Sequence, residues 1–193
     1  MVFNNIKAVY LDRDGVVNHE SDAFIKTPEE WIPVPGAIEA IARLSRLDVI
    51  IAICTNQSGI ARGKFSAKSL AMIHRRLFDC LHSAGGRVDS IRYCPHGPED
   101  NCRCRKPLPG MILDLNRCFN VAANNVIMVG DAARDLESAQ AAGVHPVLVR
   151  TGRGRVTEQS GRFSDVPTFD NLDSFSRAFL THFETQISGT SQP

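Results

Sequence analysis

Short apolar runs alternate with longer amphipathic stretches along this chain. Continuous apolar runs predict buried strands at 7–11, 48–54, 89–93, 125–129 and 145–150. Apolar residues at helical spacing predict a helix opened by Pro35-Gly36 and further helices at 66–83, 109–119, 135–142 and 172–186. Because strands alternate with helices, the pattern predicts an α/β fold, a doubly wound, three-layer, Rossmann-like parallel sheet.

The predicted elements form a single domain over residues 1–187, followed by a C-terminal tail at 188–193 that we expect to be flexible. Residues 18–35 are polar and interrupted by prolines, which is typical of a loop over a binding site; we call this segment the flap. A Gly/Arg-rich loop is expected at 151–155. No insertion is long enough for a separate domain over the site, so we expect a capless fold.

Composition and charge restrict the possible partners. The chain has 193 residues, 43% of them hydrophobic and 22% charged, with a formal net charge of +1 at pH 7. A charge this close to zero gives no reason to expect nucleic acid as a partner. No apolar run approaches the roughly 20 residues of a membrane span, and Met1–Lys7 lacks the apolar core of a signal peptide. We therefore expect a cytoplasmic protein, monomeric, with reduced cysteines.

Two acids follow the first predicted strand directly. The run Ala8–Leu11 ends in Asp12-Arg13-Asp14-Gly15. In an open parallel sheet, ligands bind just beyond the carboxyl ends of the strands. Two like charges so close together need a cation or a proton to coexist. The sequence therefore predicts Mg²⁺ chemistry with a carboxylate nucleophile at this edge of the sheet.

Residues of complementary chemistry follow the other strands. Thr55-Asn56 come after the second strand, Lys106 precedes the helix at 109–119, and Asp131 follows the fourth strand. Phosphoryl transfer needs an in-line nucleophile and cations on the developing charge. Thr55 and Lys106 are suited to hold the phosphoryl oxygens in such a reaction.

The acids can divide the remaining tasks. Asp12 is expected to attack phosphorus and form an aspartyl-phosphate, which water then cleaves. Asp14 is expected to protonate the leaving oxygen and later to activate water. Asp12, the backbone carbonyl of Asp14, and Asp131 would bind Mg²⁺ through oxygen. Asp135 is either a partner of the metal site or an acid at a helix start, and its spacing from Asp131 favours the first.

A second constellation lies between the third strand and Lys106. It is Cys94-Pro95-His96, followed after five residues by Cys102-Arg103-Cys104. Three cysteines and a histidine are a complete tetrahedral ligand set for Zn²⁺. Because no ligand position is left open, we expect a structural zinc that clips this loop and orders Arg105 and Lys106.

The D-x-D-G motif at Asp12, the Thr55-Asn56 strand end, Lys106 and the G-D-x-x-x-D motif at Asp131 resemble the haloacid dehalogenase superfamily of phosphatases. The cysteine loop is similar to that of the subfamily of histidinol-phosphatases and heptose-bisphosphatases. The stretches 55–63, 104–111 and 148–152 resemble the heptose branch. The resemblance implies a Mg²⁺-dependent phosphatase acting on a small-molecule sugar bisphosphate.

The resemblance also implies substrate contacts. Arg105 would recognise the substrate, and the contact set would be Arg13, Glu20, Ser21, Asp22, Asn56, Gln57, Ser58 and Arg105. The chain departs from the family at Ala132, where the family often has a lysine that contacts substrate.

Two other functions stay open. One is a histidinol-phosphate phosphatase, an activity often fused to a dehydratase domain for which 193 residues leave no room. The other is an inactive binding module ordered by zinc. The intact charged set argues against the inactive module, because such charges are costly to cluster without a ligand.

Overall fold

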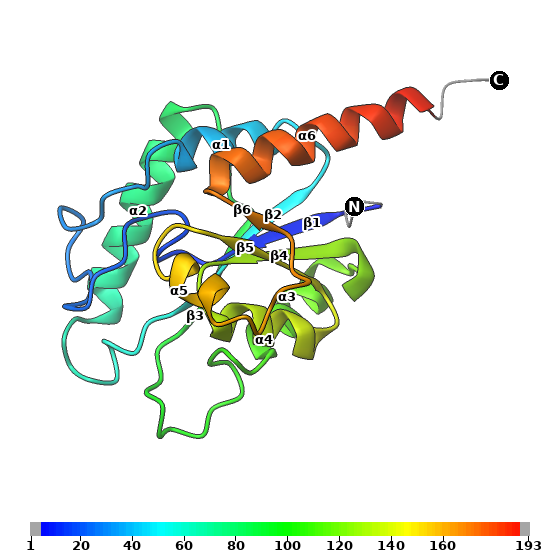
Figure 1. The fold of residues 1–193 in the computed structure, drawn as a ribbon. Coiled ribbons are helices and arrows are strands. Elements are labelled where there is room, and N and C mark those ends of the chain that lie inside the picture. The colour runs from blue at the N-terminus through cyan, green and yellow to red at the C-terminus, as the bar shows by residue number, and fades with distance from the viewer. Residues whose placement is uncertain (1–4, 190–193) are drawn as a thin grey trace.

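Six parallel strands form one sheet in the order β3-β2-β1-β4-β5-β6 (Figure 1). The computed structural model of the chain describes residues 5–189, with side chains described through residue 183. The strands are β1 (Ala8–Leu11), β2 (Ile50–Asn56), β3 (Ser90–Cys94), β4 (Val126–Gly130), β5 (His145–Val149) and β6 (Thr168–Phe169). This arrangement confirms the prediction of a doubly wound parallel sheet.

Helices cover both faces of the sheet, which gives three layers (Figure 1). On one face lie α1 (Ala37–Leu44), α2 (Ala67–Ser83) and α6 (Leu172–Gly189). On the other lie α3 (Gly110–Phe119) and α4 (Ala133–Ala142), with a 3₁₀ turn at Ala123–Asn125 before β4. A short helix, α5 (Gly154–Gln159), follows β5.

Side-chain alternation along the strands explains why both faces are apolar. In β1, Val9 and Leu11 belong to the core under α1, α2 and α6. Ala8 and Tyr10 belong to the opposite core, with Met111 and other residues of α3 and α4. Since successive strand residues point to opposite faces, a continuous apolar run is what a strand covered on both sides requires.

The last third of the chain differs from the sequence prediction. The segment 151–155, predicted as a loop, runs into α5, and β6 adds a strand that was not predicted. Both α5 and β6 are too short for a hydrophobic period to be recognised in the sequence. Helix α4 begins at Ala133, two residues earlier than predicted. Helix α6 continues to Gly189, into the segment predicted as a tail; residues 190–193 lie outside the described part of the chain.

The strand order changes direction at β1, which lies between β2 and β4. Strands β2 and β3 lie on one side of β1, and β4, β5 and β6 on the other. The backbone hydrogen bond from Asp12 N to Val129 O, at 2.9 Å, continues the β1–β4 pairing beyond the end of β1. The crevice at such a switch point is where open α/β sheets bind ligands, so the topology places Asp12 and Asp131 side by side.

Two long connections lie near this edge. One is residues 12–36, which include the flap, and the other is residues 95–109, which carry the cysteines. Within residues 5–189 neither contains a helix or a strand. In the same range no helix is long and apolar enough to cross a membrane.

Candidate active site

Asp12 lies buried immediately after β1. Its carboxylate contacts other described residues through Oδ1. This oxygen accepts from the backbone N–H of Arg13 at 2.7 Å and pairs with Lys106 Nζ at 2.9 Å. Burial raises the pKa of Asp12 to about 7, and the neighbouring carboxylate of Asp135 adds to the rise, while Lys106 opposes it. The carboxylate therefore needs nearby positive charge to stay ionised as a nucleophile.

Lys106 is buried between two acids. Its ammonium lies 2.9 Å from Asp12 and 2.6 Å from Asp135, and it donates to the carbonyl oxygen of Cys54 at 2.8 Å. The contact with Cys54 is a hydrogen bond, and the two carboxylates pair with the ammonium as ions. Burial alone would lower the pKa of Lys106, but the charges of Asp12 and Asp135 raise it overall. Lys106 thus orients Asp12; its predicted contact with the phosphoryl group stays a prediction.

Asp131 sits against two glycines at the end of β4. A Cβ at Gly15 or at Gly152 would lie 2.2 Å from Asp131 Oδ2, so any side chain at either position would displace this carboxylate. Oδ2 accepts from the backbone N–H of Arg153 at 2.7 Å, whereas Oδ1 is buried with no hydrogen-bond partner. Burial, together with Asp135 and Asp12, raises the pKa of Asp131 to about 8.

These acids suit a divalent cation. Carboxylate oxygens of Asp12, Asp131 and Asp135 lie within 4.8 Å of one another. A buried carboxylate oxygen without a partner is costly unless a cation or a proton binds it. Asp135 already accepts from the backbone N–H of Ala132 at 3.0 Å and pairs with Lys106. Asp135 therefore caps helix α4 and anchors Lys106, which leaves Asp12 and Asp131 as the better-suited metal ligands.

Asp14 is held as a carboxylate by its neighbours. Arg13 donates to it from Nε at 3.1 Å and from Nη2 at 2.9 Å, Asn18 Nδ2 donates at 2.8 Å, and Gln57 Nε2 donates at 2.9 Å. Burial alone would raise the pKa of Asp14, but the Arg13 charge and these hydrogen bonds lower it overall. Asp14 lines the pocket, as expected for a group that meets the leaving oxygen.

Arg13 pairs with Asp14 inside the protein. Its side chain is fully buried and is absent from the described pocket lining. Besides pairing with Asp14, its guanidinium lies 3.4 Å from Nε2 of His74 on α2. Burial and the Arg13 charge lower the pKa of His74 to about 4, so the imidazole is neutral and can accept from Arg13. Arg13 therefore positions Asp14, and its predicted contact with substrate stays a prediction.

The end of β2 joins the two halves of the site. Thr55 Oγ1 accepts from Gln57 Nε2 at 2.9 Å, which leaves the hydroxyl proton available to donate. Asn56 exchanges two hydrogen bonds with the backbone of Lys106, at 3.0 and 3.1 Å. The predicted phosphoryl-binding pair, Thr55 and Lys106, is thus brought together by Asn56.

A pocket of about 280 Å³ opens beside these groups. Of the predicted substrate contacts, the structure places Glu20, Ser21, Asp22, Asn56, Gln57, Ser58 and Arg105 in its lining. Further lining residues are Phe24, Ile25 and three arginines: Arg62 and Arg153, which the sequence offers as candidate contacts for a second phosphate, and Arg134, which the sequence did not single out. With Arg105, four arginines line one small pocket, which suits a ligand with more than one negative charge.

The flap is fastened over the pocket by ion pairs. Arg153 Nε contacts both carboxylate oxygens of Glu20 at 2.9 Å, and Arg153 Nη2 contacts Asp22 at 3.2 Å. Since the backbone N–H of Arg153 also holds Asp131, one residue links the flap to the carboxylate cluster. By contrast, Arg150 is paired with Glu158 and Asp170 outside the pocket.

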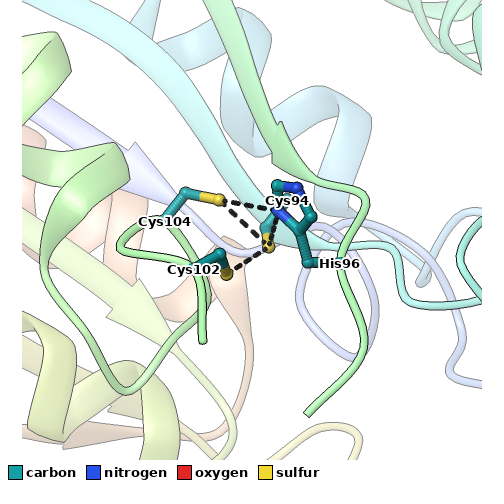
Figure 2. A group of neighbouring side chains, drawn as sticks. All are labelled: Cys94, His96, Cys102 and Cys104. Atoms are coloured by element: carbon teal, nitrogen blue, oxygen red, sulfur yellow. Dashed lines mark hydrogen bonds between the residues drawn. The ribbon is translucent and has the colours of Figure 1, made fainter. Parts of the chain in front are cut away.

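The cysteine loop forms a compact ligand cluster (Figure 2). Cys94 Sγ lies 3.6 Å from Cys102 Sγ, 3.2 Å from Cys104 Sγ and 3.6 Å from Nδ1 of His96, and His96 Nδ1 lies 3.3 Å from Cys104 Sγ. A tetrahedral zinc site with bonds of about 2.0–2.3 Å has ligand–ligand edges of roughly 3.5–3.8 Å. The four donors therefore fit one ion at their centre.

Hydrogen bonds connect this cluster to the site. Gln57 N donates to Cys94 O at 2.7 Å, Ala61 N donates to Pro95 O at 3.2 Å, and Arg105 Nη1 donates to His96 O at 3.3 Å. Both the segment after Thr55 and Arg105 thus depend on the backbone of the cysteine loop.

Sequence reasoning missed two residues of the site. His74 lies in the middle of an amphipathic helix, and only the fold shows that it faces Arg13. Arg134 stands inside the G-D-x-x-x-D motif, in the first turn of α4. Its position between Asp131 and Asp135 could have indicated a role in the site, because the first turn of a helix that begins at the site lies close to it.

The chain is similar to known phosphatases. A family model described as HAD-hydrolase-like matches residues 103–177. The D-glycero-β-D-manno-heptose-1,7-bisphosphate 7-phosphatase of Pseudomonas putida is 46% identical over 175 residues, which are 91% of this chain and 100% of that enzyme. The enzyme of the same name from Bordetella bronchiseptica is 52% identical over 156 residues, which are 81% of this chain and 87% of that enzyme.

Solved structures agree with this similarity. The crystal structure of D,D-heptose 1,7-bisphosphate phosphatase from B. bronchiseptica, complexed with magnesium and phosphate, matches with a TM-score of 0.89 at 47% identity; the match covers 92% of this chain and 99% of that one. The enzyme from Burkholderia thailandensis matches with a TM-score of 0.72 at 33% identity, over 90% and 98% of the two chains.

Proposed function

The chain belongs to the haloacid dehalogenase-like phosphatases, and from this membership we propose that it removes the 7-phosphate of D-glycero-β-D-manno-heptose 1,7-bisphosphate. The observation that carries the proposal is the placement of Asp12. Its Oδ1 is held by Lys106 and by a backbone N–H, beside Asp131 and two residues before Asp14, which lines a pocket with four arginines. The names of the relatives support the β anomer and the 7-position.

The reaction proceeds in two phosphoryl transfers. Asp12 attacks phosphorus; the new bond joins phosphorus to the Asp12 carboxylate, and the ester P–O bond breaks. Asp14 is an anion in this structure, so it must first take up a proton, from water or from the substrate's phosphate, which it then passes to the sugar oxygen that leaves. Asp14, now an anion favoured by Arg13, Asn18 and Gln57, takes a proton from water, which attacks phosphorus and releases orthophosphate from Asp12.

The proposal includes two metals. Asp12, Asp131 and the backbone carbonyl of Asp14 would hold Mg²⁺, which supplies positive charge to the phosphoryl oxygens. The buried, unpartnered Oδ1 of Asp131 supports this assignment. Cys94, His96, Cys102 and Cys104 would hold a structural Zn²⁺, which keeps the segment before Arg105 and Lys106 in place.

We place the reaction in the cytoplasm, on the route to ADP-heptose for the lipopolysaccharide core. The relatives are bacterial enzymes whose named substrate is a heptose bisphosphate. The product would keep its anomeric phosphate, the group needed to form a nucleotide sugar. The partner is therefore a small sugar phosphate, and we propose a monomeric enzyme.

A phosphate-release assay tests the proposal. The β-heptose bisphosphate should be hydrolysed with a higher kcat/KM than its α anomer and than histidinol phosphate. Asp12→Asn should abolish release with all three, because it removes the nucleophile. Equal or faster hydrolysis of histidinol phosphate would refute the assignment of substrate, and activity in Asp12→Asn would refute the mechanism.

A further inference from the structure

Arg134 is a partly buried charged residue of the site. It stands in the first turn of α4, between Asp131 and Asp135, and lines the pocket. Among the described residues its buried Nε has no hydrogen-bond partner, and its Nη2 lies 3.8 Å from Glu20 Oε1, which is beyond hydrogen-bond distance. A buried guanidinium N–H left unpaired costs free energy, so the structure holds a donor ready for a ligand.

The position of Arg134 is at the reacting end of the pocket. The negative charges that act on its guanidinium are, in order of strength, Asp12, Asp135, Asp131 and Glu20. Three of these form the buried carboxylate cluster, and the fourth belongs to the flap. Arg134 therefore lines the pocket within the field of the carboxylate cluster and beside Glu20 of the flap.

The other expected donor is occupied. Lys106 is ion-paired with Asp12 and Asp135 and donates to the carbonyl of Cys54, and Arg13 is paired with Asp14. Thr55 has one hydroxyl proton to give. A phosphoryl group in transfer carries charge on three equatorial oxygens, which a single hydroxyl cannot satisfy.

The net charge of the site also indicates that a phosphoryl group there needs the positive charge of Arg134. Three buried carboxylates and Lys106 sum to minus two, and a bound Mg²⁺ brings this sum only to zero. Arg134 makes the site positive before a dianionic phosphate enters. Arg13 neutralises Asp14 and contributes nothing further.

We propose that Arg134 is a catalytic residue that donates from its unpaired guanidinium to the transferring phosphoryl group and stabilises its charge. The inference rests on the proposed phosphatase activity. In this proposal Arg134 contacts the phosphoryl group, and Lys106 orients Asp12. Glu20 serves as the weak counter-ion that aims Arg134 in the free enzyme, and the phosphate replaces it.

The test compares Arg134→Gln and Arg134→Lys with Arg162→Gln. Arg162 is an exposed arginine paired with Glu137 of α4, so its loss removes the same charge outside the pocket. Two substrates are used, the heptose bisphosphate and p-nitrophenyl phosphate, which has no second phosphate. Removing one transition-state donor should lower kcat about 100- to 1000-fold on both substrates in Arg134→Gln, with KM changed by less than about 5-fold. Arg134→Lys should recover part of kcat, and Arg162→Gln should keep it.

Orthovanadate provides an independent readout. Because it mimics the phosphoryl group in transfer, its affinity should fall in Arg134→Gln far more than that of inorganic phosphate. Unchanged kcat and vanadate affinity would overturn the proposal. So would a loss confined to the KM of the bisphosphate, since Arg134 would then bind the second phosphate.

The use of two substrates distinguishes a failure of the proposed role of Arg134 from a failure of the proposed substrate. A wild-type protein that hydrolyses p-nitrophenyl phosphate but not the heptose bisphosphate refutes the substrate and still tests Arg134. If Arg134→Gln fails to fold, as judged by its circular dichroism spectrum, Arg134→Lys is used in its place. A lower kcat and weaker vanadate binding in Arg134→Lys than in the wild type support the proposal, and wild-type values of both contradict it.

Discussion

Two glycines define the geometry around Asp131 as closely as the charged residues do. Gly15 and Gly152 both adopt positive φ, at 85° and 54°, and their Cα atoms leave room for the carboxylate. At either position a methyl group would overlap Asp131 Oδ2. The position of the Asp131 carboxylate, which we propose as a Mg²⁺ ligand, therefore depends on residues that have no functional group.

We predict that Gly152→Ala lowers kcat/KM about 100-fold, because displacing a catalytic group by roughly 1 Å has an effect of this size. Gly161→Ala is the matched control. Gly161 also has positive φ, at 71°, but a Cβ there meets nothing within 4 Å. Both variants carry similar backbone strain. Steady-state kinetics with Mg²⁺ titration should find the loss in Gly152→Ala alone; an equal loss in both variants would contradict the role of Asp131.

Among the elements, the cysteine loop acts on the site through its backbone. Carbonyl oxygens of Cys94, Pro95 and His96 accept from Gln57, Ala61 and Arg105. A metal ion that fixes the four ligands would therefore fix these acceptors as well. Structural zinc sites contribute folding free energy directly.

Cys102→Ser should lose zinc and activity together. We expect about one zinc per wild-type chain by elemental analysis, less than about a tenth of this in the variant, and a lower melting temperature. Cys118→Ser is the control, because Cys118 is exposed and lies outside the cluster. Wild-type protein free of zinc, or full activity in zinc-free Cys102→Ser, would contradict the structural role.

For the whole molecule, the carboxylate cluster couples stability to pH and to Mg²⁺. Folding raises the pKa of Asp12 to about 7 and that of Asp131 to about 8, chiefly by burial. The unfolded values are about 4. Between these limits the folded state binds more protons than the unfolded state, so the free energy of unfolding falls as pH rises from about 4 to about 8.

Bound Mg²⁺ should offset this loss, because it favours the ionised carboxylates. We predict that saturating Mg²⁺ raises the melting temperature of the zinc-loaded protein more at pH about 8 than at pH about 5.5. Differential scanning calorimetry measures this. Asp131→Asn should show a smaller Mg²⁺ effect at the higher pH. A Mg²⁺ effect that is independent of pH would refute the coupling.

The sequence predicted those features that a local pattern encodes. Apolar runs located five of the six strands, and polar residues at their ends located Asp12, Thr55 and Asp131, because side chains after parallel strands share one edge. Cysteine spacing located the cluster of three cysteines and a histidine. The sequence did not reveal that Lys106 is buried between two acids, that Arg13 is buried, or that Arg134 Nε has no hydrogen-bond partner among the described residues. Those facts depend on distances between elements far apart in the chain.

³¹P NMR can follow the two phosphates of D-glycero-β-D-manno-heptose 1,7-bisphosphate during the reaction, and so tests the proposed activity directly. We expect the 7-phosphate signal to be replaced by inorganic phosphate while the anomeric phosphate signal persists, and we expect Asp12→Asn to leave both signals unchanged. Loss of the anomeric phosphate, or an unaltered spectrum with wild-type enzyme and Mg²⁺, would contradict the proposed activity.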